Sequence, residues 1–385
     1  MENIKKGVEE GVFGAITLDT SIFDRNNLNF ESGLLKHLKQ FRYGSTKLII
    51  SDIVYKEVMN HLKKKTTNSV TELENALNQI RIPWLVDEKT LNEVKLLLIG
   101  NNSADSISKI RLQAFINETN AEVIEAGKLI DVQNLIDRYF DVMPPFEETG
   151  KKKNEFPDAI ALLTIDAWAN KKNTKVLVIT TDKGWKDYCD KSERLVALED
   201  LNTTLSLFQL QTNAYEVCFL LSEQVKKNNL FLWEAVEKAL DYQSWNMDFT
   251  LEAEASYPYE SEITEIVYKN FEFLVIDDSE IYFRPIEVDD SYIVTEASIR
   301  VKYEVEGNFY FSVWDSIDKE DIPIGGGKKT SEVTVDIDVL ITLDISDIEN
   351  FEDFSIVDVE ILNTSHDVDF GFVDLDWDGG VDEYD

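Results

Sequence analysis

Residues 175–182 read Lys-Val-Leu-Val-Ile-Thr-Thr-Asp, a short apolar run followed by two hydroxyl residues and an acid. The run is continuously apolar rather than alternating, which is typical of a strand buried on both faces of a parallel sheet. Two earlier stretches have the same design, Ala-Ile-Thr-Leu-Asp at 15–19 and Lys-Leu-Ile-Ile-Ser-Asp at 47–52. Helical patterns separate these runs, so the sequence predicts an α/β fold with a doubly wound, mainly parallel sheet. An antiparallel edge strand is compatible with the pattern.

Two helical patterns lie between the predicted strands. Ser51 is a suitable N-cap for a helix that runs to Leu62, and Pro157 suits the first turn of a helix over residues 157–169. The stretch from 66 to 140 is rich in helix signals with little strand signal. We therefore expect it to be a helical insertion.

The negative charge of the chain is concentrated in its C-terminal part. Residues 246–385 contain 38 acidic and 7 basic residues, a net charge of −31, whereas the first 245 residues carry a net charge of −5. Only the first part can approach a polyanion without strong repulsion. Residues beyond 246 alternate between apolar and polar, which predicts an acidic, antiparallel β-sandwich-like domain. The expected division is a domain over 1–205, a helical connector over 206–245 and an all-β domain over 246–385.

Other features of the composition limit the cellular setting and the kind of metal site. Cys189 and Cys218 are the only cysteines, and residues 1–11 lack the apolar segment of a secretory signal. No apolar run reaches the roughly 18 residues needed to span a bilayer. We expect a cytoplasmic protein with no membrane partner. Only three histidines are present, so a metal would be held by oxygen ligands.

Acidic residues follow the predicted strands and begin the predicted helices. Asp19 and Asp182 come after strands whose carboxyl ends meet at one edge of the sheet, where ligands bind in such folds. Glu57 lies on the helix that starts at this edge, and the helix at Pro157 brings Asp158, with Glu155 before it, to the same place. Acids that converge repel one another unless a divalent cation lies between them. The alternative is that they are helix caps and solvated surface groups.

The four acidic segments resemble, in order and local context, the motifs of PIN-domain nucleases. The segments are residues 18–21, 51–58, 156–160 and 179–185. The chain is most similar to a bacterial PIN-like subgroup that carries Glu-Phe-Pro-Asp-Ala after a lysine-rich loop. The resemblance covers roughly residues 12–200, departs from the family in the size of the insertion, and does not include the acidic part. It implies a metal-dependent nuclease, usually acting on RNA, whose metal-binding and catalytic acids are Asp19, Glu57, Asp158 and Asp182.

The implied reaction is hydrolysis of a phosphodiester by water that Mg²⁺ or Mn²⁺ activates. Glu155 is a candidate additional ligand. Candidates for orienting the ligands are Thr20, Ser21 and Thr181. Candidates for binding phosphate are Lys151, Lys152 and Lys153, with a solvated loop as the alternative. Trp185 is a candidate for stacking on a base, with packing of the next helix as the alternative.

Several functional readings remain open from sequence alone. The leading one is a ribonuclease, with a role as a toxin or in defence by analogy only. A second is a structure-selective DNA nuclease. A third is a non-catalytic interaction protein whose acidic domain binds a basic partner, and that domain could also contact the basic rim of the first one. The sequence does not set the oligomeric state, and a dimer is one option. The acidic end, residues 374–385, resembles the start of an EF-hand loop but lacks an exit helix, so we interpret it as a soluble edge strand with a frayed tail.

Overall fold

The computed structural model describes residues 2–146, 155–209, 212–227, 230–244, 247–276, 281–289, 291–317, 319–345, 355–362 and 365–375. The chain divides into two compact units, Met1–Leu210 (unit 1) and Gln211–Asp385 (unit 2). The predicted phosphate-binding lysines at 151–153 and the acidic end from 376 lie outside the described residues. No helix in the described ranges is both long enough and apolar enough to cross a membrane.

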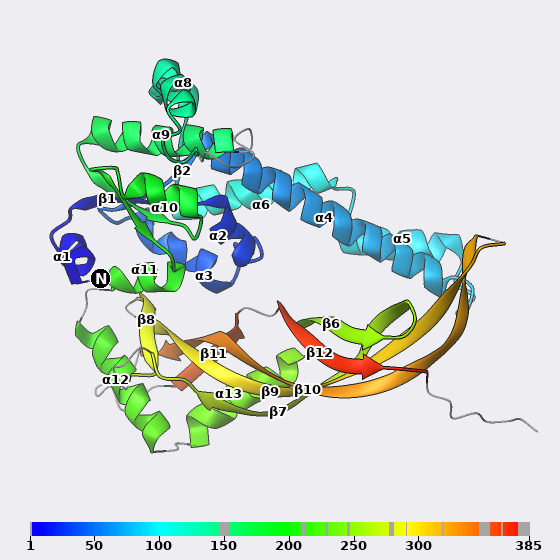
Figure 1. Ribbon diagram of the computed structural model, residues 1–385. Helices are drawn as coiled ribbons and strands as arrows, with labels where there is room; N and C mark the ends of the chain where they lie inside the picture. Colours follow the sequence, from blue (N-terminus) through cyan, green and yellow to red (C-terminus); the bar gives the residue numbers. More distant parts are fainter. Residues whose placement is uncertain are drawn as a thin grey trace, which may run out of the picture. The chain divides into compact units, whose positions relative to one another are not determined.

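Unit 1 is built on a five-stranded sheet in the order β3-β2-β1-β4-β5 (Figure 1). Every neighbouring pair in it is parallel, which confirms the predicted fold class. The three predicted strands are the central ones, and their core residues, such as Leu177 and Val178, are fully buried. The two outer strands were not predicted, because three or four residues are too few to show a pattern. The strands are β1 (Phe13–Leu18), β2 (Lys47–Ser51), β3 (Glu122–Ile124), β4 (Lys175–Ile179) and β5 (Leu195–Leu198).

Unit 1 differs from the predictions in the length of one helix and in a strand within the expected helical insertion. The helix after β2 begins as expected, with the Ser51 hydroxyl accepting a hydrogen bond of 3.2 Å from the N–H of Val54. It does not end near Leu62 but continues to Ile80. The expected helical insertion also contains β3, which extends the sheet beside β2.

The helices of unit 1 are, in chain order, α1 (Glu2–Glu9), α2 (Thr20–Arg25), α3 (Gly33–Lys36), the 3₁₀ helix η1 (His37–Arg42), α4 (Asp52–Ile80), α5 (Glu88–Ile99), α6 (Ala104–Thr119), α7 (Ala126–Leu129), α8 (Val132–Phe140), α9 (Phe156–Lys172), α10 (Lys183–Cys189) and α11 (Leu201–Leu207). Of these, α9 contacts β2, β3 and β4, which places it across the middle of the sheet.

Unit 2 contains the predicted antiparallel sheet, in the order β11-β10-β9-β7 with β8 also paired to β9. One face of the long strand β9 is buried, at residues such as Ile299, Val301 and Tyr303. Phe249 and Phe370 pack on this face against Tyr303 and Phe309, from a separate two-stranded sheet of β6 and β12. Its strands are parallel, which differs from the expected all-antiparallel sandwich. The strands are β6 (Asp248–Ala255), β7 (Tyr259–Phe273), β8 (Phe283–Val288), β9 (Tyr292–Asp315), β10 (Glu320–Asp344), β11 (Ser355–Ile361) and β12 (Ser365–Val373).

Two helices complete the core of unit 2. They are α12 (Thr212–Lys226) and α13 (Leu230–Gln243), in the region predicted as a connector. α12 contacts β8, and α13 contacts β7 and β11. The side chain of Trp233 on α13 packs against the rings of Phe271 and Phe273. The second unit is therefore an α+β structure, with its strands and both helices sharing one core.

Most basic side chains in the part of unit 2 beyond residue 246 are already paired with acids of the same unit. The sequence from 246 onward has seven of them. Five form ion pairs, namely Lys269–Glu304, Arg284–Glu296, Arg300–Asp336, Lys302–Glu332 and Lys328–Glu306. Because the acids outnumber the bases, a large negative charge is left over, which opposes binding of nucleic acid by this unit.

Candidate active site

The first acid of the site lies where the order of the sheet reverses. β1 and β4 are neighbours, with Leu18 opposite Ile179 at their carboxyl ends. β2 and β3 follow β1 on one side of the sheet, whereas β5 follows β4 on the other side, so the strand order reverses between β1 and β4. Ligands are expected to bind between these two strand ends. Asp19 follows β1 directly, and its N–H donates a hydrogen bond of 2.9 Å to the carbonyl of Ile179. The backbone of Asp19 is thereby fixed at this switch point, where the strand order reverses.

Two hydroxyl groups hold the carboxylate of Asp19. Ser21 Oγ and Thr180 Oγ1 both donate to Asp19 Oδ2, at 2.6 and 3.0 Å. The residue is only 6% exposed. Burial raises the pKa of Asp19 above its ordinary value, the two hydroxyl hydrogen bonds oppose this rise, and the charge of Asp182 adds to it. The buried carboxylate is thus oriented by neutral donors rather than by a cation.

Glu57 comes to the site from the second turn of α4. Thr20 Oγ1, at the start of α2, donates a hydrogen bond of 2.7 Å to Glu57 Oε2. Because Thr20 directly follows Asp19, this bond ties the α4 acid to the end of β1. The sequence predicted that the helix after β2 would start at this edge, and its capped start positions Glu57 there.

Asp158 and Asp182 are connected through one buried side chain. Asp182 caps α10, with its Oδ1 accepting a hydrogen bond of 2.9 Å from the N–H of Trp185. The indole Nε1 of Trp185 donates a bond of 2.8 Å to Asp158 Oδ1, in the first turn of α9. Trp185 is 1% exposed. A ring so deeply buried has no free face for a base, so the structure favours packing over the stacking role.

The charges of the other three acids act on Asp158. The pKa of Asp158 is raised to about 6, chiefly by burial and further by the charges of Asp19, Asp182 and Glu57, while the hydrogen bond from Trp185 opposes the rise. The side chains therefore lie close enough to repel. In the described part of the chain, no three or more His, Cys, Asp or Glu side chains are arranged so as to hold a metal ion as they stand.

The hydroxyl groups of the site differ partly from those named from sequence. Thr20 and Ser21 bond to the acids as described above. Thr180 does so as well and was missed: besides bonding Asp19, its oxygen accepts a hydrogen bond of 3.0 Å from the N–H of Asp182. It is fully buried, whereas Thr181 is partly exposed. In the sequence, Thr180 and Thr181 are adjacent, and a pair of adjacent threonines does not reveal which one faces Asp19.

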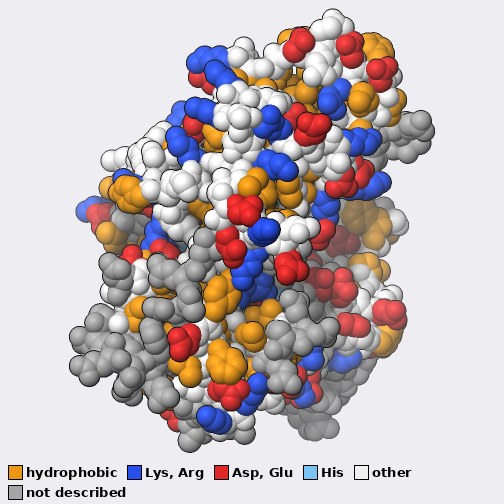
Figure 2. Space-filling model, turned by 90° about the vertical axis from the view of Figure 1, so that its left-hand side faces the viewer, with side chains coloured by type: hydrophobic (Ala, Val, Ile, Leu, Met, Phe, Trp, Pro, Cys, Tyr) orange, Lys and Arg blue, Asp and Glu red, His pale blue; other side chains and the backbone are white. Residues whose placement is uncertain are grey.

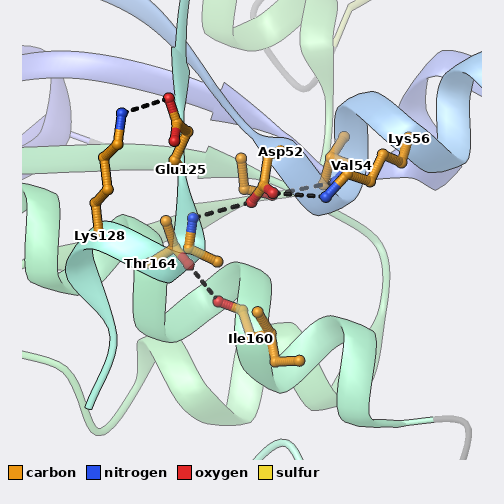
Figure 3. A network of polar contacts seen from close by, with 9 residues as sticks. Asp52, Val54, Lys56, Glu125, Lys128, Ile160 and Thr164 are labelled. Atoms are coloured by element: carbon orange, nitrogen blue, oxygen red, sulfur yellow. Dashed lines mark hydrogen bonds and ion pairs between the residues drawn. The ribbon is translucent and has the colours of Figure 1, made fainter. Parts of the chain in front are cut away.

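Asp52 follows a strand just as Asp19 does, but it has a structural role. One of its oxygens accepts a hydrogen bond of 3.0 Å from the N–H of Ala126, and the other pairs with Lys56 at 2.7 Å. Figure 3 shows this network, which joins the start of α4 to α7. The pKa of Asp52 is lowered: burial raises it, but the bonds to Lys56 and Ala126 together outweigh burial. Asp52 therefore provides an internal comparison for the four acids.

Glu155 lies one residue before α9 and is partly buried. It is close in sequence to Asp158, but the acids whose charges raise the pKa of Asp158 are Asp19, Asp182 and Glu57. A ligand role for Glu155 stays a prediction. The lysines that precede it lie in the segment from 147 to 154, outside the described residues.

The fold and the four acids together define an open α/β domain with an acidic site at the switch point of its sheet. Residues 16–185 match the family model of the PIN domain, and all four acids lie within the match. This region is therefore a PIN domain, as the resemblance of the motifs predicted. No curated protein and no solved structure matches the chain. PIN domains are generally nucleases and typically use divalent metal ions.

Proposed function

We propose that this chain is a metal-dependent endonuclease that hydrolyses phosphodiester bonds, with RNA as the preferred substrate. The observation that carries the proposal is that Asp158 is largely buried at the switch point of a PIN domain, close enough to Asp19, Asp182 and Glu57 for their charges to add to the rise in its pKa. Such a cluster is costly in a bare protein, and a cation bound between the carboxylates offsets the cost. We also propose that Asp19, Glu57, Asp158 and Asp182 are the metal ligands.

The residues present fit a hard divalent cation. Mg²⁺ and Mn²⁺ prefer oxygen donors, and the four acids and the hydroxyl groups described at the site supply carboxylate and hydroxyl oxygens. None of the ion pairs found among the described residues involves one of the four acids. The acids are not preassembled at ligand positions. Binding would therefore involve rotation of carboxylates that repel one another in the bare protein.

Each neighbour of the acids has a defined part in the proposed mechanism. A divalent ion, if bound between the four acids, would supply an activated water and would stabilise negative charge on the phosphate. Ser21 and Thr180 donate hydrogen bonds to Asp19, and Thr20 donates one to Glu57. Trp185 donates through its indole to Asp158 and through its backbone N–H to Asp182. These donors keep the carboxylates ionised and oriented, which is the usual work of groups behind metal ligands.

RNA is favoured over long duplex DNA by the surface as well as by the family resemblance. On the face displayed in Figure 2, Lys and Arg side chains are interspersed with Asp and Glu. Duplex DNA presents a dense row of phosphates, which suits a broad basic field. A mixed surface better suits a short or structured strand. A cytoplasmic setting and a toxin or defence role are further parts of this proposal, the latter by analogy.

Unit 2 supports a second, separate proposal. Its excess of acids over bases, with five of the seven bases beyond residue 246 already paired, suits a basic partner protein or a basic region of this same chain. If the acidic unit restrains the nuclease by such a contact, added salt will raise the cleavage rate of the full chain before it weakens substrate binding. A rate that only falls with salt contradicts the restraint.

The test of the nuclease proposal is cleavage of single-stranded RNA, transfer RNA, and single- and double-stranded DNA by the full chain. Each substrate is incubated with Mg²⁺, with Mn²⁺ and with EDTA. We expect internal cleavage of RNA that requires the metal. Cleavage of DNA alone would replace RNA as the substrate, and no cleavage of any substrate would contradict the proposal.

A further inference from the structure

Three polar contacts join the α2 segment to α4, and the first of them is part of the active site. They follow one another in order along both segments, with distances of 2.7, 2.9 and 2.8 Å. They link Thr20 Oγ1 to Glu57 Oε2, Asp24 Oδ1 to His61 Nδ1, and the carbonyl oxygen of Asn27 to Lys65 Nζ. The two segments therefore run side by side, starting at the acidic cluster.

The side chains along these two segments change in character with distance from the acidic cluster. Glu57 belongs to the acidic site, whereas Lys64 and Lys65 lie two turns further along α4, which is about 11 to 12 Å along the helix axis. Both lysines are exposed. A hollow of about 490 Å³ opens at this level. Its lining residues are Asp24, Asn27, Leu28, His61, Lys64, Lys65, Asn68, Ser69 and Glu72.

Lys64 and Lys65 bring positive charge to the hollow, and the acids that line it lie apart from them or have a partner. Asp24 is already paired with His61, through both carboxylate oxygens at 2.9 Å. Glu72 lies two turns beyond Lys65, away from the acidic cluster. Arg111 lies behind the lysines, where its guanidinium donates a bond of 3.0 Å to the carbonyl of Leu28 and forms an ion pair of 2.6 Å with Glu31, so Lys64 and Lys65 are the cations of this hollow on which the inference rests. Burial, and next the nearby charge of Arg111, lower the pKa of Lys65.

We infer that this hollow binds backbone phosphates of a single nucleic-acid strand, on one side of the bond that is cleaved. The inference rests on the proposed nuclease function of the acidic cluster. The four acids repel a phosphate chain, so a strand needs cations close by to stay in place. Lys64 and Lys65 supply them within a few nucleotides of the cleaved bond. Phosphate contacts of this kind set position and register without reading sequence.

The experiment measures binding of a fluorescent single-stranded RNA oligonucleotide by the full chain in EDTA, over a range of salt concentrations. EDTA prevents metal-dependent cleavage, so binding is observed separately from the proposed reaction. The test variant is Lys64→Gln with Lys65→Gln. The matched control is Lys171→Gln with Lys172→Gln, a pair of adjacent exposed lysines at the end of α9 opposite Asp158. A Lys64→Arg, Lys65→Arg variant tests for rescue.

We expect the test variant to bind about tenfold more weakly than the wild type. The slope of log affinity against log salt should fall by about 1.4, since each lost single-strand phosphate contact contributes about 0.7. The control pair should bind like the wild type, and the arginine pair should restore most of the affinity. Arginine keeps the positive charge, so rescue separates charge from a local structural effect.

The inference is overturned if the test variant binds as tightly as the wild type, if the control pair loses as much affinity, or if the wild type binds no RNA. The same proteins assayed with Mg²⁺ or Mn²⁺ separate this inference from the nuclease proposal. Binding that depends on Lys64 and Lys65 without any cleavage contradicts the nuclease function only. Cleavage with unchanged binding in the test variant contradicts the phosphate site only.

Discussion

The indole Nε1 of Trp185 donates a hydrogen bond of 2.8 Å to Oδ1 of Asp158. The backbone N–H of the same residue donates to Asp182, so one buried tryptophan positions acids from two helices. The bond also opposes the effects of burial and repulsion, which together raise the pKa of Asp158 to about 6. Trp185 is therefore a positioning residue for the proposed metal site.

Replacing Trp185 by Phe should shift the pH dependence of cleavage. Loss of the Nε1–H donor removes a contact that favours the ionised carboxylate, so the pKa of Asp158 should rise further. A protonated Asp158 binds metal poorly, and the acidic limb of the kcat/KM profile should therefore move to higher pH. Tyr188→Phe is the control, because its hydroxyl contacts Asp166 rather than the four acids. An acidic limb that stays in place in Trp185→Phe argues against the positioning role.

Thr180→Val should lower kcat/KM by about 10- to 100-fold, the usual range for groups that orient metal ligands. Valine keeps the shape of the side chain but removes both the donor to Asp19 and the acceptor for the N–H of Asp182. Thr181→Val is the matched control and should have a smaller effect. A larger loss in Thr181→Val would show that the threonine named from sequence is the important one.

Asp158→Asn should stabilise the metal-free protein at neutral pH, by about 1–2 kcal/mol. The amide oxygen can still accept the bond from Trp185, while the repulsion by the other acids is removed. Because the folded-state pKa of Asp158 is raised, its contribution to stability is full below its unfolded pKa. That contribution is lost as pH rises through about 6.

The measurement is chemical denaturation of wild type and Asp158→Asn in EDTA, between about pH 4 and pH 8. The difference in unfolding free energy should grow in favour of the variant as pH rises. Added Mn²⁺ should stabilise the wild type more than the variant. A difference that is constant with pH would mean that the pKa of Asp158 is not raised in the folded protein by burial and by its neighbours.

The central strands and the four acids were predictable, because each strand is a continuous apolar run and each acid stands beside a strand end or a helix start. The full length of α4 was also in the sequence, since no Gly or Pro interrupts residues 52–82. By contrast, the choice of Thr180 over Thr181 depends on how β1 and β4 are aligned. The contact from Trp185 to Asp158 joins residues 27 positions apart on two helices, and local patterns do not encode such distances.

The strands of unit 2 were predictable from the sequence, but the neighbour with which each strand pairs was not. The alternation of apolar and polar residues predicts strands and shows which face is buried. It does not reveal that β12 pairs in parallel with β6, more than 100 residues earlier, because a strand pattern carries no information about its neighbour. The packing of α12 and α13 on the five-stranded sheet was not predicted, because a helix pattern likewise carries no information about its neighbour.

The most direct test of the account compares metal-dependent RNA cleavage by wild type, Asp19→Asn, Asp158→Asn and Asp52→Asn. Asp52 is the matched control, an acid at a strand end that is held by Ala126 and Lys56 instead of facing the cluster. The account predicts that Asp19→Asn and Asp158→Asn each lose at least about 100-fold in rate while Asp52→Asn stays within about threefold of wild type. Cleavage that persists in Asp19→Asn and Asp158→Asn, or an equal loss in Asp52→Asn, would contradict it.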